Sequence, residues 1–318
     1  MKKTIFFACV VLSGMLGSCK YSPEPVRVQS LSLTFHNLPA SRAGEVYALW
    51  CDVPKGTVAP IKGMHEGASV SKLVGTFRVV DTSVFGLDLS KAKANIGVDF
   101  TLISDAELSV ENPDSITDEP KAIYLVGSPI VGTTTYGTTT MRADVEEVFG
   151  TDQSTIIANA TLASAAKTAA NYKGEVYLMN ANDPTNTSKS LAPDPLPFLP
   201  GTWQYGMWTI DSSATPPVNT FLGYIRGVKA KDSKSAKDNF NYPGGRSPND
   251  VSPVLDLTTG MGRVLVSLEP AVLQTDPVTP FHQPVLWGTV PQGQAAFTPF
   301  GLQNVSGVYP TIDVKIYR

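Results

Sequence analysis

Two glutamates follow a serine at the same spacing in distant parts of the chain. The first stretch reads Leu108-Ser109-Val110-Glu111-Asn112 and the second reads Val266-Ser267-Leu268-Glu269-Pro270. Such carboxylates could bind a cation or act as general acids, but paired catalytic carboxylates must meet in one site. Because Glu111 and Glu269 lie in different halves of the chain, we expect each at its own strand end. There a backbone N–H or a nearby lysine can satisfy the carboxylate, so no catalytic residue is predicted.

Other chemistry-bearing patterns are weak. Of the three histidines, His36, His65 and His282, none has a partner at a metal-ligand spacing. His65 is followed by Glu66 in a glycine-rich stretch, where a solvated loop is the simpler interpretation. The chain contains no nucleophile elbow, phosphate-binding loop or dinucleotide fingerprint. We therefore expect no metal, no cofactor and no enzymatic activity.

The start of the chain is typical of a processing signal. Two lysines precede an apolar run from Thr4 to Leu16, which is too short for a stable membrane anchor. The run ends in Leu16-Gly17-Ser18-Cys19, which resembles a bacterial lipobox. The alternative is an ordinary secretory signal with an incidental cysteine.

The lipobox resemblance implies a signal peptide over residues 1–18, cleavage before Cys19, and lipid on the Cys19 sulfur and the new N-terminus. Several acyl chains would give stable attachment to a membrane. Lys20 after the cysteine resembles lipoproteins of the outer membrane. Residues 19–29 contain two prolines and are expected to form an extended tether.

Composition favours a weakly charged globular protein with many turns. Of the 318 residues, 42% are hydrophobic and 17% are charged, with 26 glycines and 25 prolines. The formal net charge of −3 argues against nucleic acid as a partner, because phosphate binding needs clustered lysine and arginine. These values predict an all-β chain long enough for two domains.

The elements that carry the two glutamates belong to a longer pattern that occurs twice. It contains a Leu-Pro turn, Tyr-x-x-Trp, an apolar-Gly strand start, the Ser-x-Glu strand and a final apolar run ending in glycine. The first copy is Leu38, Pro39, Tyr47, Trp50, Gly75, Ser109, Glu111 and Gly127. The second copy is Leu199, Pro200, Tyr205, Trp208, Gly223, Ser267, Glu269, Pro270 and Gly288. Landmarks that recur in the same order indicate a duplicated β module.

We place the first module at residues 30–131 and the second at residues 154–318, with a linker at 132–153. In the first module, strands are expected at 46–53, 72–80, 84–89, 97–103, 107–111 and 123–126. The threonine-rich stretch at 133–140 is either an extended linker or an added strand. The alternating residues 311–318 predict a terminal strand that pairs with a sheet edge.

Each tryptophan of the repeat shares a strand face with a small residue two positions earlier. Trp50 follows Ala48, and Trp208 follows Gly206. A large ring beside a small residue fits over a strand, so we interpret both tryptophans as core anchors. The alternative is an exposed platform for a ligand. Cys51, beside Trp50, is interpreted as a small buried hydrophobic residue and not as a nucleophile.

The landmarks of both copies resemble the extracytoplasmic domain of anti-sigma-K-type factors. The second copy fits better, because Asn112 of the first copy replaces the usual proline. This resemblance implies an immunoglobulin-like β-sandwich, here in two tandem modules. It carries over no catalytic site, and we expect neither the sigma-binding domain nor the membrane-spanning helix of such factors.

Three functions remain open at this stage. The first is a non-enzymatic, lipid-anchored protein of the bacterial envelope, in which the modules bind a protein or polysaccharide or act as a spacer. The second is an accessory of an envelope-stress or anti-sigma signalling system. The third is a glycan-acting enzyme that uses Glu111 or Glu269.

Overall fold

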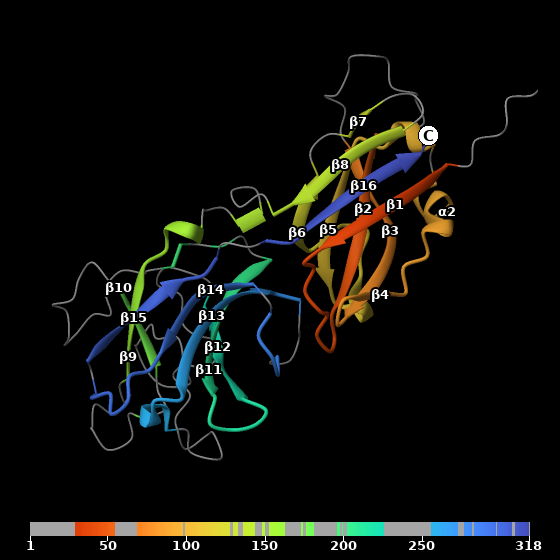
Figure 1. The fold of residues 1–318 in the computed structure, drawn as a ribbon. Coiled ribbons are helices and arrows are strands. Elements are labelled where there is room, and N and C mark those ends of the chain that lie inside the picture. Colours follow the sequence, from red (N-terminus) through yellow and green to blue (C-terminus); the bar gives the residue numbers. More distant parts are fainter. Residues whose placement is uncertain are drawn as a thin grey trace, which may run out of the picture.

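The computed structural model describes most of the two predicted modules. The described residues are 29–54, 69–97, 99–127, 130–132, 136–143, 148–149, 153–162, 173, 176–180, 196–197, 199, 202–225, 256–272, 277–281, 283–296, 298–306 and 309–317. Cys19, Pro200, His65 and His282 lie outside these residues. The chain folds into two antiparallel sheets, which confirms the predicted all-β fold of two tandem sandwich-like modules (Figure 1).

The first sheet takes its strands from both ends of the described chain. They are β1 (Ser30–His36), β2 (Val46–Pro54), β3 (Ser69–Val80), β4 (Ser83–Phe85), β5 (Asp105–Glu111), β6 (Ala122–Gly127), β7 (Val131–Gly132), β8 (Tyr136–Arg142) and β16 (Thr311–Tyr317). Their order is β1-β16-β8-β6-β5-β2-β3-β4, and β7 also pairs with β8. In Figure 1, β1, β16 and β8 lie across β2, β3 and β5, so one folded sheet supplies both layers.

The second sheet has the order β10-β9-β15-β14-β13-β11-β12. Its strands are β9 (Ala158–Leu162), β10 (Val176–Asn180), β11 (Trp203–Asp211), β12 (Val218–Ile225), β13 (Gly262–Pro270), β14 (Pro284–Thr289) and β15 (Pro299–Asn304). The short helices of the described chain are η1 (Leu89–Lys91), α2 (Ala92–Ile96), η2 (Phe100–Leu102), η3 (Pro113–Ser115), η4 (Gln153–Thr155) and η7 (Leu257–Thr259).

The strands that carry the repeated landmarks are arranged identically in the two sheets. Neighbouring strands follow the order β6-β5-β2-β3 in the first sheet and β14-β13-β11-β12 in the second. A register shift falls between Leu49 and Trp50 in β2, and its counterpart falls between Met207 and Trp208 in β11. A second pair of shifts precedes Ser109 in β5 and Ser267 in β13. Shared bulges at equivalent positions support the duplication, because bulges are positional features of a fold.

The C-terminal strand forms as predicted, but its position in the sheets differs from the prediction. It forms a strand as expected, but β16 pairs with β1 on one side and with β8 on the other, so it is not at a sheet edge. It also belongs to the first sheet, although we placed residues 154–318 in the second module. Alternation buries Ile312, Val314 and Ile316, but the same pattern fits any half-buried strand, so it could not identify the neighbours.

Three further expectations about local structure were wrong or incomplete. The expected linker contains β8, so the threonine-rich stretch supplies an added strand of the first sheet. The strand expected at 97–103 is replaced by η2, whose N-cap Asp99 accepts a hydrogen bond from the Thr101 N–H at 2.8 Å. Phe100 and Ile103 are both buried, and this three-residue spacing suits a 3-10 turn. The strand expected at 84–89 is reduced to β4, which ends at Phe85.

Candidate functional site

The Ser-x-Glu strand of the first module forms a buried hydrogen-bond network with the repeat tryptophan. Trp50 Nε1 donates to Ser109 Oγ at 2.9 Å, and Ser109 Oγ donates to Glu111 Oε1 at 2.7 Å. The backbone N–H of Lys121 donates to the same carboxylate oxygen at 2.7 Å. Trp50 is 1% exposed, and Ser109 and Glu111 are fully buried. The expected backbone N–H partner of this glutamate is therefore present.

The second module repeats the network around Glu269 Oε1. This oxygen accepts hydrogen bonds from Ser267 Oγ at 2.5 Å, from the Phe281 N–H at 3.0 Å and from Trp208 Nε1 at 3.2 Å. Gly206 is required here, because a Cβ at this position would lie 2.5 Å from Glu269 Cγ. Both networks are closed to solvent, which excludes the alternative of exposed tryptophan platforms.

The tryptophans are buried as predicted, but on the other face of their strands from the main core. In β2, Tyr47 and Leu49 belong to the large cluster, which also includes residues of the second module. In β11, Trp208 instead forms a separate small cluster with Phe221 and Leu265. Each central strand is thus buried on both faces, and the tryptophan belongs to the second face.

The two glutamates differ in their second carboxylate oxygen. Glu269 Oε2 accepts a hydrogen bond at 2.5 Å from Nη1 of Arg42, which lies in the loop before β2 of the first module. Arg42 Nε also donates to Glu45 Oε2 at 2.9 Å, and its Nη2 pairs with Glu45 Oε1. Among the described residues, Glu111 Oε2 has no hydrogen-bond partner. The junction therefore contains one arginine between two carboxylates, which we call the Arg42 clasp (Arg42, Glu45 and Glu269).

The clasp lies in a low-dielectric environment. The side chains of Arg42 and Glu269 are 4% and 0% exposed. Burial raises the pKa of Glu269 above its ordinary value of 4.5, although Arg42, Ser267 and the Phe281 N–H act in the opposite direction. Burial would lower the pKa of Arg42, but hydrogen bonding to Glu45 and the charge of Glu269 together raise it. Arg42 therefore stays charged.

Aromatic rings fill the rest of the junction between the modules. Trp203 packs 5.7 Å from Tyr124 and 5.9 Å from Phe281, measured between ring centroids. Trp203 Nε1 donates to the Ile123 carbonyl at 2.8 Å, and Tyr124 OH donates to Gln283 Oε1 at 3.0 Å. Tyr124 and Ile123 belong to the first module and the other three residues to the second. Buried polar contacts of this kind fix the two modules against each other.

The remaining landmarks have structural positions in or beside the strands. Tyr47 OH donates to the Pro39 carbonyl at 3.0 Å, and Tyr205 OH donates to Gln153 Oε1 at 2.9 Å. The other described landmarks are Leu38 before β2, Gly75 in β3, Gly127 in β6, Leu199 before β11, Gly223 in β12, Pro270 at the end of β13 and Gly288 in β14.

No group of three or more potential metal ligands occurs among the described residues. Cys51 is buried, and burial raises the pKa of its thiol to about 12. Such a thiol carries almost no thiolate near neutral pH, so it is a poor nucleophile.

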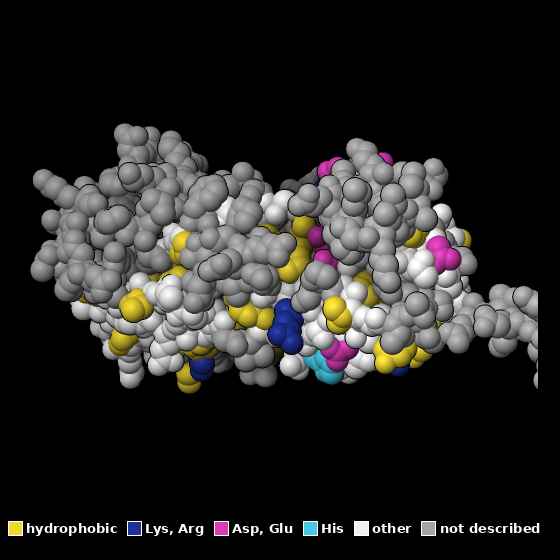
Figure 2. Space-filling view, turned by 90° about the horizontal axis from the view of Figure 1, so that it is seen from above, with side chains coloured by type: hydrophobic (Ala, Val, Ile, Leu, Met, Phe, Trp, Pro, Cys, Tyr) yellow, Lys and Arg dark blue, Asp and Glu magenta, His cyan; other side chains and the backbone are white. Residues whose placement is uncertain are grey.

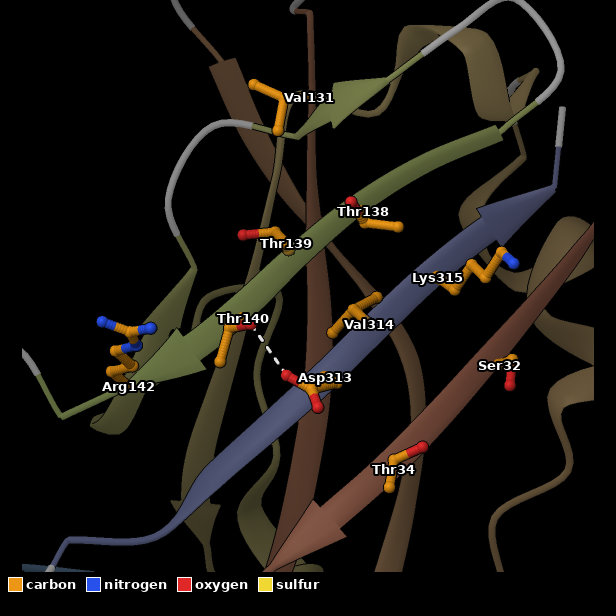
Figure 3. A pocket seen from close by; sticks show the side chains of 10 residues that line it. All are labelled: Ser32, Thr34, Val131, Thr138, Thr139, Thr140, Arg142, Asp313, Val314 and Lys315. Atoms are coloured by element: carbon orange, nitrogen blue, oxygen red, sulfur yellow. Dashed lines mark hydrogen bonds between the residues drawn. The ribbon is translucent and has the colours of Figure 1, made fainter.

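A different surface presents polar side chains to solvent in register. The outward residues of β1, β16 and β8 form four rows across the three strands, and we call them the polar face. The rows are Ser30-Tyr317-Tyr136, Ser32-Lys315-Thr138, Thr34-Asp313-Thr140 and His36-Thr311-Arg142. Part of this face is a groove of about 540 Å³ (Figure 3).

Side chains on the polar face are partly fixed by one another. Asp313 accepts a hydrogen bond from Thr140 Oγ1 at 2.7 Å, and His36 Nε2 lies 3.1 Å from its other oxygen. These contacts lower the pKa of Asp313. The side chains of His36 and Asp313 are both exposed. Figure 2 shows a cyan histidine side chain on the surface close to an acidic and a basic side chain. Sequence reasoning missed this surface, because only the pairing of β16 with β1 and β8 brings the rows together.

No described helix has both the length and the apolar character that crossing a membrane requires. Comparisons of the chain with protein-family models, curated proteins and solved structures find no match in any of the three.

Proposed function

We propose that the chain is a non-enzymatic, lipid-anchored protein of the bacterial cell envelope that binds an envelope protein or polysaccharide. The observation that carries this proposal is the polar face, where hydroxyl, carboxylate and cationic groups lie in register on three paired strands. A surface built on paired strands keeps its donors and acceptors in place, so little ordering entropy is lost on binding. The cell-envelope location rests on the lipobox at Cys19.

The proposed anchor and the polar face are close in sequence. The chain from Cys19 to β1, which begins at Ser30, spans at most about 36–40 Å if fully extended. The polar face would then lie near the membrane surface. We place the protein at the outer membrane because Lys20 follows the lipobox cysteine. The Arg42 clasp and the aromatic junction favour a rigid two-module body, which also suits a role as a spacer.

Signalling is the second candidate, and its specific support is the repeated strand order. The landmarks that resemble anti-sigma-K-type domains fall on equivalent strands of both sheets. An accessory of such a signalling system would use a domain of this kind to pair with the related sensor domain of another protein. If this candidate is correct, deletion of the gene changes the level of envelope-stress transcripts, and unchanged transcripts would refute it. We do not propose glycan hydrolysis, because Glu111 and Glu269 are both fully buried.

Two experiments test the main proposal. Cys19→Ala should move the protein from the membrane fraction to the soluble fraction, and intact-mass spectrometry should detect acyl chains only on the wild type. Capture from envelope extract should enrich a specific component with the wild type and much less with a Thr34→Ala, Thr138→Ala double variant. The matched control is Lys72→Gln, which changes an exposed residue of β3 away from the polar face. Equal capture by all three proteins would refute binding through this face.

A further inference from the structure

The polar face holds two cations, of which Arg142 acts electrostatically on Asp313 and lowers its pKa. Lys315 and Arg142 form no salt bridge with any described residue, whereas Asp313 is already engaged by Thr140 and His36. The chain as a whole has a formal net charge of −3, so a lysine with no salt-bridge partner among the described residues departs from its general character. Charge complementarity therefore favours an anionic ligand at this face.

Lys315 is held in place by aromatic rings. Its Nζ lies 5.0 Å from the ring centroid of Tyr136 and 5.0 Å from that of Tyr317. A cation between two ring faces is attracted by both quadrupoles, which restricts the flexible lysine without cancelling its charge. Tyr136 and Tyr317 are 41% and 39% exposed and Lys315 is half-buried, so all three residues reach solvent.

Residues with hydroxyl groups flank Lys315 in the same row. Ser32 pairs with Lys315 on one side and Thr138 pairs with it on the other. The next row adds Thr34 and Asp313 (Figure 3). The site thus combines a fixed cation with donors and acceptors for hydroxyl groups and with exposed apolar ring surface, which suits sugar rings that carry an acidic group.

We infer that the polar face binds an acidic polysaccharide, with an anionic group of the polymer on Lys315 and its hydroxyl groups along the rows of Thr34 and Thr138. This inference rests on the proposed binding function and names its ligand class. The four rows extend over about 20 Å, since alternate residues of a strand are roughly 6.6 Å apart. A polymer can contact all four rows, whereas a single lipid headgroup would use one, so we choose the polymer over an anionic lipid.

The test measures binding of the soluble chain that begins after Cys19 to three polymers, using isothermal titration calorimetry at moderate ionic strength. Polygalacturonate should bind, and neutral dextran should not. Lys315→Gln should weaken polygalacturonate binding by about tenfold or more, as expected for loss of one charge-assisted hydrogen bond. Lys72→Gln removes the same charge from β3 and should leave the affinity unchanged. Circular dichroism of each variant confirms that the fold is retained.

Several outcomes would overturn the inference. These are absence of polygalacturonate binding, equal losses in Lys315→Gln and Lys72→Gln, binding only to the more densely charged dextran sulfate, or binding to phosphatidylglycerol vesicles but not to polygalacturonate. The proposed function has a separate readout. If envelope capture remains sensitive to Thr34→Ala and Thr138→Ala while the acidic polymer fails to bind, the ligand class is wrong and binding through the polar face stands.

Discussion

Replacing Arg42 with methionine tests the junction between the modules. Methionine retains much of the apolar stem of arginine but leaves the carboxylates of Glu45 and Glu269 without their shared cation. Both carboxylates are buried, with side chains 2% and 0% exposed. Removing one partner of a buried ion pair costs about 3–5 kcal/mol, because the other charge stays uncompensated in a low-dielectric environment. We expect a loss of this size in the free energy of unfolding.

The measurement is urea unfolding followed by tryptophan fluorescence, since Trp203 lies in the junction and Trp50 in the first module. The main core is continuous across both modules, so the wild type should unfold in one transition. The midpoint should fall in Arg42→Met. Lys173→Met is the control, because it removes a salt bridge to Asp256 whose side chains are 49% and 39% exposed. An exposed pair of this kind contributes little, so the control midpoint should not move.

A second substitution separates loss of charge balance from loss of packing. In the Arg42→Met background, Glu269→Gln removes one buried charge that has lost its partner. It should therefore restore about 1–3 kcal/mol of the lost free energy of unfolding. Recovery should be greater at neutral pH than at pH 4, where protonation already neutralises part of the carboxylate. The reasoning is refuted if Arg42→Met costs less than about 1 kcal/mol, or if the second substitution deepens the loss at neutral pH.

Three further predictions follow from the buried networks. Glu111→Gln should change the free energy of unfolding little, because Glu111 Oε2 has no hydrogen-bond partner among the described residues. Glu269→Gln should lower it by about 2 kcal/mol, because the ion pair of Glu269 with Arg42 is lost. Equal losses in the two variants would contradict this prediction. Folding raises the pKa of Glu269, so the folded state binds the proton of this carboxyl more tightly than the unfolded state does. The free energy of unfolding should therefore fall as pH rises from about 4.5 to the raised pKa. Curves of this free energy against pH should diverge between the wild type and Glu269→Gln over that window, and parallel curves would refute the prediction. Gly206→Ala should lower the free energy of unfolding, measured in urea, by about 1–3 kcal/mol, because the added Cβ would clash with Glu269 Cγ. An unchanged free energy would mean that the contact between Gly206 and Glu269 relaxes without cost, which contradicts the prediction.

Much of the fold could be predicted from the sequence, because buried and exposed side chains alternate along a half-buried strand. Alternation located β16, and the repeated landmarks located β5 and its equivalent strand β13 before their pairing was known. Neighbour choice could not be predicted in this way. The period of β16 sorts its residues into two faces, but the long-range pairing with β1 depends on how the sheet closes. The 3-10 turn η2 was missed because a capping aspartate competed with a weak strand pattern.

The candidate site was predictable only where it is local. Burial of Trp50 and Trp208 follows from the small residue beside each, and the backbone partner of Glu111 was expected from its position at a strand end. Arg42 gave no comparable signal, because its partner Glu269 is distant in sequence and lies in the other module. The polar face was also missed, since outward residues of separate strands become one surface only after the strands are paired.

In the proposed function, the face formed by β1, β16 and β8 contacts a specific envelope component. A photo-crosslinking side chain placed at Thr138 in cells that make the protein tests this most directly, with the same group at Lys72 of β3 as the matched position. Binding through this face predicts a discrete adduct from position 138 that is absent from position 72. Identical adducts from both positions, or none from position 138, would contradict it.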